Sequence, residues 1–415
     1  MPVSNHLLSL LWLSSLTVLV TPTQAWTAPW AAAVATTTPT IAETTAPVEE
    51  TPQQLPTKVA VIGATGRTGR YVVRELASRY GSSSDATQIV AVVRSPEKAQ
   101  TVLGDLTTND ENDNKNIELC TCPDLTNRAA VAQALQGVDV AIWCATGFSS
   151  EQSNTNLVDR AKTLLGIATK RTIDSLALPL IAQALMENNN NKNNNNYNNP
   201  PGPQIIMCSS AGVTRPTWDD AKKARFPGAA DIPIVRLNPF GILDVKRESE
   251  EGLRKICNDA AVPYCIVRPC GLNDNWPAGS RPIVSQGDVA VGRMNRRDVA
   301  ALLVDLVGQP AAVGKTFEVV GLAGYPKGDA ESLTAALERL QLDNNNNNGA
   351  EDDVLSLEQV TATYATMQQL LPGETQDSAA LAMGQTYEQL DQGETGRLGE
   401  RGLEKVEEAG LRTTG

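Results

Sequence analysis

The clearest chemical pattern of the chain is a run of spaced glycines, Gly63-Ala64-Thr65-Gly66-Arg67-Thr68-Gly69. In this spacing the first glycine permits a sharp turn, the second lets the backbone approach a pyrophosphate, and the third lets a helix pack on a strand. The N–H groups at the start of that helix then face the phosphates. The pattern predicts a dinucleotide site formed by the loop residues Gly63, Thr65, Gly66, Arg67, Thr68 and Gly69.

The segments on either side of this loop are those that such a site requires. Residues 58–62 form the apolar run of a buried strand, and residues 67–80 have helical spacing, with Val72 and Leu76 on one face. Glycine spacing alone is a weak signal, but a strand before it and a helix after it make the prediction specific.

The end of the next predicted strand, residues 89–93, indicates which dinucleotide is bound. Proteins that prefer NAD carry Asp or Glu there, which binds the 2′-hydroxyl of the ribose. Here the strand is followed by Arg94, whose guanidinium can pair with a 2′-phosphate, and Arg67 points to the same region. The sequence therefore predicts a preference for NADP(H) over NAD(H).

Composition excludes several other kinds of chemistry. The single histidine is His6, in a predicted targeting segment, so the mature protein is expected to have no imidazole. This excludes Ser/His/Asp and Cys/His nucleophile systems and His-ligated zinc, and we expect no metal site. The formal net charge is −12 without a long basic stripe, which sets nucleic-acid binding aside. The seven cysteines lie mostly in apolar runs and are expected to be buried free thiols.

Buried strands and amphipathic helices alternate along the rest of the chain, which predicts an α/β fold with a doubly wound parallel sheet, the Rossmann type. Further strands are expected at 117–121, 138–144, 204–209, 264–268 and 317–320, and further helices at 128–135, 174–186, 243–260 and 297–307. Two asparagine tracts, within 188–200 and at 344–348, are interpreted as disordered loop expansions, because asparagine repeats bury nothing.

The amino terminus has the pattern of a targeting sequence. Leu7 to Val20 is an apolar run of signal-peptide length, and cleavage is expected after Ala25, giving a signal peptide at 1–25 and a transit or linker segment at 26–57. Trp26 directly after the cleavage site resembles the bipartite presequences of algae with secondary plastids. The second segment is acidic, whereas transit peptides are usually basic, so secretion, an endomembrane location and an uncleaved anchor remain alternatives to the plastid.

The chain beyond the predicted dinucleotide-binding domain, 58–324, is interpreted as a helical, partly disordered extension, 325–415. Its helical stripe consists of Leu357, Val360, Tyr364, Met367 and Leu371. This stripe is expected to pack either on the main domain or on a protein partner.

Several segments occur in the order of a known family: GATGRTGR, VVR, Cys208-Ser209-Ser210-Ala211-Gly212, VKRESEEGLRK, VRPCGL and RRDVA. From about Lys58 to Val320 the chain resembles the NmrA-like, atypical branch of the short-chain dehydrogenase/reductase superfamily, near its plastid members. The resemblance implies an adenine contact by Asp124 and Leu125, a nicotinamide-ribose contact by Ala145, Thr146 and Gly147, and active-site positions for Ser209 and Ser210. It also implies closure over the nicotinamide by Pro269, Gly271 and Leu272, and a helix-start motif in which Asn295 and Asp298 form a capping arrangement.

Catalysis is the open question that the resemblance leaves. Many members of the superfamily use Tyr-x-x-x-Lys, in which the lysine lowers the tyrosine pKa and the tyrosine transfers the proton. Lys246 matches the lysine, but Ile242 stands one helical turn earlier and cannot carry a proton. Some reductases of this branch manage with the lysine alone, so Lys246 and Ser210 are the candidate catalytic residues, and Lys246 is also a candidate cofactor ligand.

Two functions follow. The first is an NADPH-dependent oxidoreductase of a small plastid metabolite, whose identity the sequence does not name. The second is a non-catalytic NADP(H)-binding protein for plastid regulation or assembly, which would contact a partner through its carboxyl-terminal extension. A sugar-nucleotide epimerase or dehydratase would need the missing tyrosine.

Overall fold

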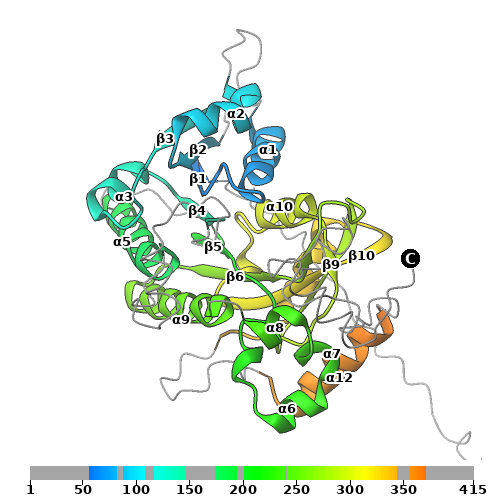
Figure 1. The fold of residues 1–415 in the computed structure, drawn as a ribbon. Coiled ribbons are helices and arrows are strands. Elements are labelled where there is room, and N and C mark those ends of the chain that lie inside the picture. Colours follow the sequence, from blue (N-terminus) through cyan, green and yellow to red (C-terminus); the bar gives the residue numbers. More distant parts are fainter. Residues whose placement is uncertain are drawn as a thin grey trace, which may run out of the picture. The chain divides into compact units, whose positions relative to one another are not determined.

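An eight-stranded sheet organises the computed structural model of the chain (Figure 1). Its strand order is β3-β2-β1-β4-β5-β6-β10-β8, and only β8 runs antiparallel to its neighbour. The structure describes residues 56–81, 87–107, 116–145, 173–193, 201–238, 241–343 and 355–370. The strands are β1 (Lys58–Ile62), β2 (Gln88–Val93), β3 (Ile117–Thr121), β4 (Val140–Trp143), β5 (Ile205–Cys208), β6 (Tyr264–Pro269), β8 (Ser280–Ser285) and β10 (Lys315–Pro326).

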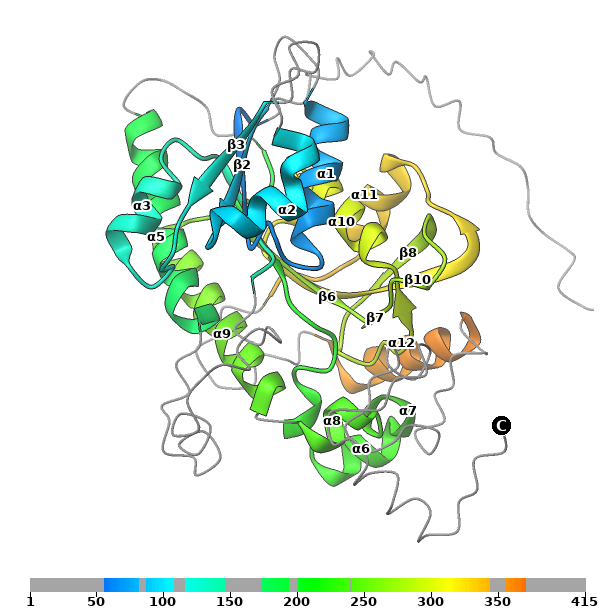
Figure 2. The ribbon, with the colours of Figure 1, turned by 45° about the horizontal axis from the view of Figure 1, so that its top comes forward.

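Helices cover both faces of this sheet, which confirms the predicted doubly wound α/β class (Figure 2). Alternate strand residues point to opposite faces, so Val59 and Val61 pack on one side while Ala60 and Ile62 pack on the other. The first face carries α1 (Gly69–Tyr80), α2 (Pro96–Thr107), α10 (Arg296–Asp305) and α11 (Ala330–Glu338). The second carries α3 (Arg128–Ala134), α5 (Ile173–Asn193) and α9 (Ile242–Ala260).

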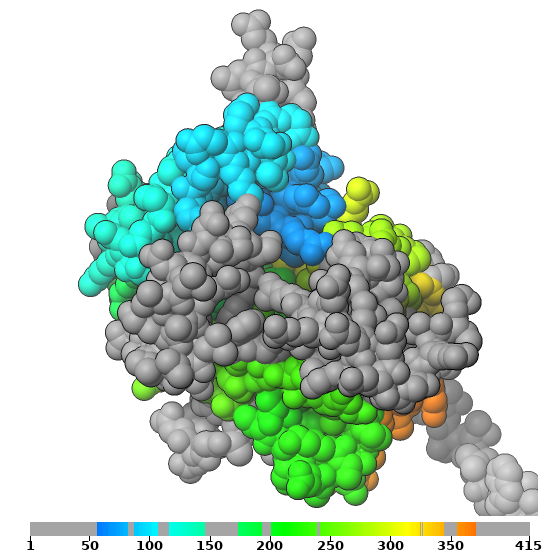
Figure 3. Space-filling model, viewed as in Figure 1, coloured from blue at the N-terminus to red at the C-terminus, as the bar shows by residue number. Residues whose placement is uncertain are grey.

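Short elements complete the carboxyl-terminal half. Between β5 and α9 lie η2 (Arg215–Thr217), α6 (Asp220–Arg225), α7 (Pro227–Ala230) and α8 (Pro233–Leu237), which form one end of the surface seen in Figure 3. The strands β7 (Gly271–Leu272) and β9 (Arg293–Met294) pair in a small second sheet, and η4 (Pro310–Ala312) precedes β10. The sequence had indicated none of these elements as separate helices or strands, because each is too short for a periodic pattern.

Residues 188–193 of the first asparagine tract belong to a helix, which corrects the prediction that they are part of a disordered loop expansion. Helix α5 continues to Asn193. The Asn188 amide donates to Leu135 O at 2.7 Å and Val138 O at 3.1 Å, and Lys192 forms an ion pair with Asp139. The first residue of the tract is thus hydrogen-bonded to two carbonyls of the turn before β4. Residues 194–200 and the second tract lie outside the described residues.

Helix α12 (Leu357–Leu370) packs on the main domain, which is one of the two alternatives that the sequence predicted. Val360 and Met367 are buried, whereas Leu357 is exposed. In both ribbon views α12 lies beside α6 and α7 (Figures 1 and 2). Leu371 and the rest of the extension lie outside the described residues, as do nearly all of the predicted signal and transit segments, residues 1–55. No helix within the described ranges is long and apolar enough to cross a membrane.

Candidate active site

The glycine loop joins β1 to α1 in a geometry that only glycine allows at two positions. Gly63 has φ 81°, and a Cβ there would lie 2.7 Å from Ala145 N. A Cβ on Gly69 would lie 2.2 Å from Gly63 O, so the first turn of α1 sits directly on the strand end. Thr68 precedes the helix without a side-chain capping bond. The start of α1 faces this loop, where the helix dipole favours an anion, while Arg70 N and Tyr71 N donate to Gly66 O and Thr68 O at 3.1 and 2.9 Å.

The predicted catalytic residues are to be found near the carboxyl ends of the neighbouring strands β4 and β5. Trp143 and Met207 are partners across these strands, so Cys144 and Cys208 follow as neighbours. Burial raises the pKa of the Cys208 thiol to about 11, and the positive charge of Lys246 opposes the shift. The same lysine acts on Cys144. Lys246 on α9 is therefore close enough to both thiols for its charge to act on them.

The two serines after β5 differ in their surroundings. Ser209 is buried beside Glu250, which it helps to keep ionised, although its Oγ forms no well-aligned hydrogen bond within the described ranges. Ser210 is half-buried and its Oγ donates only to the carbonyl of Ala211, at 3.1 Å. Pro269 ends β6 on the same edge, and Ala211 N donates to its carbonyl. These residues line one edge of the sheet.

The predicted adenine side lies after β2 and β3. Arg94 directly follows β2 and is exposed. Asp124 follows β3, and hydrogen bonds from Thr126 hold the pKa of its carboxyl below the usual value. Leu125 is half-buried against the core. Thr146 and Gly147 lie outside the described residues.

Arg67 pairs with Asp274 Oδ2 at 3.3 Å, and its guanidinium is more than half exposed. Its predicted contact with a 2′-phosphate stays a prediction. Asp274 also pairs with Arg296 at 2.9 Å, at the start of α10. Burial raises the pKa of Asp274, but these two arginines outweigh it and lower the pKa overall. The carboxylate thus draws Arg67 toward the segment that follows β7.

The predicted capping arrangement at α10 is correct in one half only. Asn295 Oδ1 accepts from Arg297 N at 2.8 Å, as an N-cap does. Asp298 instead accepts from Gly279 N and Ser280 N, at 2.7 and 3.1 Å. The carboxylate is therefore used to fix the start of β8 rather than the start of its own helix.

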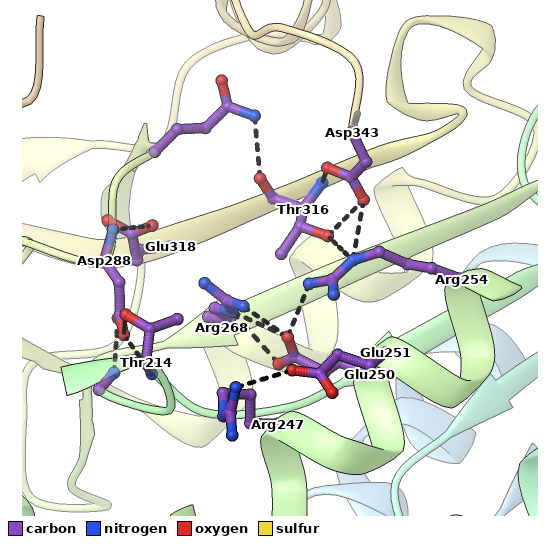
Figure 4. A network of polar contacts seen from close by, with 12 residues as sticks. Thr214, Arg247, Glu250, Glu251, Arg254, Arg268, Asp288, Thr316, Glu318 and Asp343 are labelled. Atoms are coloured by element: carbon purple, nitrogen blue, oxygen red, sulfur yellow. Dashed lines mark hydrogen bonds and ion pairs between the residues drawn. The ribbon is translucent and has the colours of Figure 1, made fainter. Parts of the chain in front are cut away.

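Sequence reasoning missed a buried polar network that lies beneath this edge (Figure 4). Glu250 on α9 accepts from Arg268 on β6 and from Arg254 one turn further along its own helix. Burial disfavours the Glu250 carboxylate, but the charges of Arg268 and Arg254 outweigh it, so its pKa is lower than usual. Since Lys246 stands one turn before Glu250, this network fixes the turn of α9 that carries the lysine.

Two buried acids, Asp288 and Glu318, join β10 to the loop after β5. Asp288 accepts from Gly212 N at 2.6 Å and from Thr214 N at 2.9 Å. Glu318 accepts from Asp288 N and from the Ser285 hydroxyl. Arg215 is fully buried and donates to the carbonyls of the segment around Asp288. No periodicity could have revealed these contacts, which join residues far apart in sequence.

The Glu318 carboxyl makes the stability of the protein depend on pH. Burial and the neighbouring Asp288 raise its pKa from 4.5 to about 7. The stability that this group contributes is therefore fully present below about pH 4.5 and lost as the pH rises to about 7, because only the unfolded chain releases the proton freely. We expect Glu318→Gln to be more stable than the wild type at pH 8, by up to about 3 kcal/mol. Denaturant unfolding at pH 8 and pH 4.5 checks this; a variant that is less stable at pH 8 contradicts it.

All seven cysteines are free, as the sequence predicted, and five of them are buried. Within the described ranges, no group of three or more His, Cys, Asp or Glu side chains could hold a metal ion.

The parallel sheet and the glycine turn between β1 and α1 define a dinucleotide-binding protein. Comparison with known proteins agrees: the profile of the NAD(P)H-binding family matches residues 63–200 and 201–310. The chain belongs to this NAD(P)H-binding family, which confirms the resemblance seen in the sequence.

Two curated relatives share much of the domain. The chain is 24% identical over 286 residues to an uncharacterised chloroplastic protein of Arabidopsis thaliana, covering 68% of this chain and 82% of that protein. It is 21% identical over 272 residues to quinone oxidoreductase 2 of Escherichia coli K12, covering 63% and 68%. Among solved structures, a putative NAD-dependent epimerase/dehydratase from Bacillus halodurans is 21% identical, with a TM-score of 0.42, covering 67% of this chain and 99% of the other.

Proposed function

We propose that the protein binds NADP(H) at the glycine loop and acts as an oxidoreductase on a small molecule. The observation that supports this proposal is that the charge of Lys246 acts on Cys144 and Cys208, the residues at the ends of β4 and β5. An ammonium there is placed to hold the ribose hydroxyls and to exchange a proton with a carbonyl oxygen. The bound cofactor would supply the hydride. The name of the E. coli relative, a quinone oxidoreductase, supports a reductase activity.

The test of this function has two stages. Calorimetric titration with NADPH and NADH measures cofactor binding by the mature chain. A screen of quinones, aldehydes and ketones, followed by the absorbance of NADPH, then measures reduction. Tight NADPH binding with turnover of at least one compound supports the proposal, and failure to bind either nucleotide contradicts it.

Cofactor preference is proposed to rest on Arg94. Its guanidinium follows β2 on the exposed surface, where an acid would select NAD. We expect NADP(H) to bind at least about tenfold more tightly than NAD(H), which corresponds to about 1.4 kcal/mol and is within reach of one charge-assisted contact. Arg94→Asp should abolish or invert this ratio in calorimetry. Equal affinities of the wild type for the two nucleotides would contradict the assignment.

We also propose that the protein acts in a plastid. The apolar run at 7–20 and the Ala25–Trp26 junction support this, together with the chloroplastic relative. Residues 1–57 fused to a fluorescent protein are expected to deliver it to a secondary plastid, with a mature amino terminus at or beyond Trp26. Microscopy and amino-terminal sequencing check this, and fluorescence in the medium or an uncleaved presequence would contradict it.

A second candidate function is non-catalytic NADP(H) binding. The observation in its favour is Ile242, which occupies the position of the tyrosine and packs into an apolar cluster with Val213 and Leu243. The apolar stripe of α12 gives this alternative little support, because Val360 and Met367 are buried on the chain's own domain. Tight NADPH binding without turnover in a broad screen would favour it.

A further inference from the structure

A groove lies between η2, α6, α7 and α8. Its volume is about 620 Å³, within the usual range for a site that takes a small molecule. Its lining is mainly apolar, with charged side chains at a few points: Arg215, Lys223, Asp231 and Arg236. The groove therefore combines apolar walls with the few polar groups by which small-molecule sites orient their ligands.

The charge of this lining is opposite to that of the whole chain. Acids outnumber bases in the sequence, 47 to 35, whereas the groove has three cations and the single acid Asp231. Asp231 pairs with Arg236 at 3.1 Å, with both side chains about half exposed. Arg215 lies beneath, where Asp288 Oδ1 pairs with it at 3.6 Å and backbone carbonyls accept from its N–H groups, so Lys223 gives the lining its net positive charge. The local field thus favours an anion.

Lys223 is the cation available to such a ligand. It is half-buried on α6, and its ammonium forms neither an ion pair nor a hydrogen bond within the ranges that the structure describes. Arg225 lies on the same short helix but does not line the groove and is exposed. The two cations therefore differ in their position relative to the groove while sharing a helix.

The groove adjoins the residues that carry the proposed chemistry. Val235 in its wall packs with Val213, which follows the serines of β5, and with Leu243 in the first turn of α9. Asn238 at its rim accepts from Leu243 N at 2.9 Å. Lys246 stands one turn further along this helix. A ligand in the groove would thus lie against the elements that position Lys246.

Helix α12 lies beside α6 and α7 (Figures 1 and 2), which contribute residues to the lining of the groove. Gly228 N donates to the Tyr364 hydroxyl at 3.1 Å, and the Tyr364 ring meets Phe226 edge-on at 5.2 Å. Phe226 is fully buried and meets Trp218 in turn, at 5.9 Å. Because α6 and α7 are too short to hold a shape alone, this aromatic stack preorganises the wall, which lowers the cost of binding.

We propose that this groove is the substrate site and that it selects a small molecule with a carboxylate on an apolar body, the carboxylate being bound by Lys223. The inference rests on the proposed oxidoreductase function. The apolar walls suit the body of such a molecule, and the uncompensated ammonium suits its charge.

The test measures binding separately from turnover. Ligand-observed NMR on the NADPH-loaded protein compares benzoate, phenylacetate and cinnamate with their neutral amides. We expect each acid to bind about tenfold more tightly than its amide, the effect of one charge-assisted contact. Lys223→Gln should remove this preference, and the matched variant Arg225→Gln should retain it.

Three results would overturn the inference: no binding of any of the acids, equal binding of acids and amides, or equal losses in the two variants. The reductase proposal is judged by a different measurement, the oxidation of NADPH by neutral quinones and aldehydes. Turnover of those compounds without any preference for acids would therefore refute the anion groove alone. Acid binding without turnover would leave the groove standing as a carboxylate site and refute the reductase.

Discussion

Lys246→Met is expected to reduce turnover at saturating NADPH by about 10²-fold or more. The reason is that no tyrosine precedes this lysine on α9, so in the proposed reaction the Lys246 ammonium would carry the proton. Steady-state kinetics on a compound found in the carbonyl screen, with NADPH affinity measured separately, checks this. If the lysine only holds the ribose, NADP(H) binding should instead weaken by about 1–3 kcal/mol while turnover at saturation persists.

Two further variants sharpen this result. Lys255→Met removes an exposed ammonium from the same helix and is expected to leave kinetics unchanged. Ile242→Tyr places a phenol one turn before Lys246, on the same face. Higher activity of this variant on simple carbonyls would show a site that lacks only its acid. The absence of any gain, together with an inactive wild type, would favour the non-catalytic function.

Glu250→Gln is expected to destabilise the protein by about 3–5 kcal/mol, the cost of leaving buried charges without their partner. The carboxylate is fully buried and compensates both Arg268 and Arg254 (Figure 4). Its lowered pKa is the mirror image of the raised pKa of Glu318, so neutralising the two acids should change stability in opposite directions at pH 8. Denaturant unfolding measures both.

The neighbouring residue provides the control for this experiment. Glu251 pairs with Arg247 one turn away, with both side chains about one third exposed. Glu251→Gln should cost only about 0.3–0.5 kcal/mol, as for other surface pairs along a helix. Similar losses in Glu250→Gln and Glu251→Gln would show that the buried network contributes no more than a surface ion pair.

The elements that could be predicted from the sequence are those with a strong local pattern. Spaced glycines between an apolar run and a helical stripe defined the loop from Gly63 to Gly69, and continuous apolar runs defined the parallel strands. The amphipathic pattern of α9 placed Lys246 on a helix near its start. In each case a few neighbouring residues determine the structure, so no knowledge of distant contacts was needed.

The remaining features depend on contacts that sequence spacing does not encode. The path of Arg67 is set by Asp274, some two hundred residues away, and the network around Glu250 joins a helix to a strand and to the segment after α11. Helices α6 and α7 are stabilised by edge-on aromatic contacts with α12 rather than by periodicity. These parts form the proposed substrate groove, which sequence spacing could not indicate.

The contacts at the start of the asparagine tract bear on the changes of chain length that the fold can tolerate here. Asn188 and Lys192 bind the end of α5 to the turn before β4 and to Asp139. Strand β5 is held by its hydrogen bonds to β4. Residues 194–200 therefore connect two points that other contacts already fix. The free energy of closing such a connection rises only with the logarithm of its length, roughly 0.6 kcal/mol for each doubling. Insertions or deletions between residues 194 and 200 are therefore expected to have little effect on the sheet. The same position is suited to the insertion of a reporter domain.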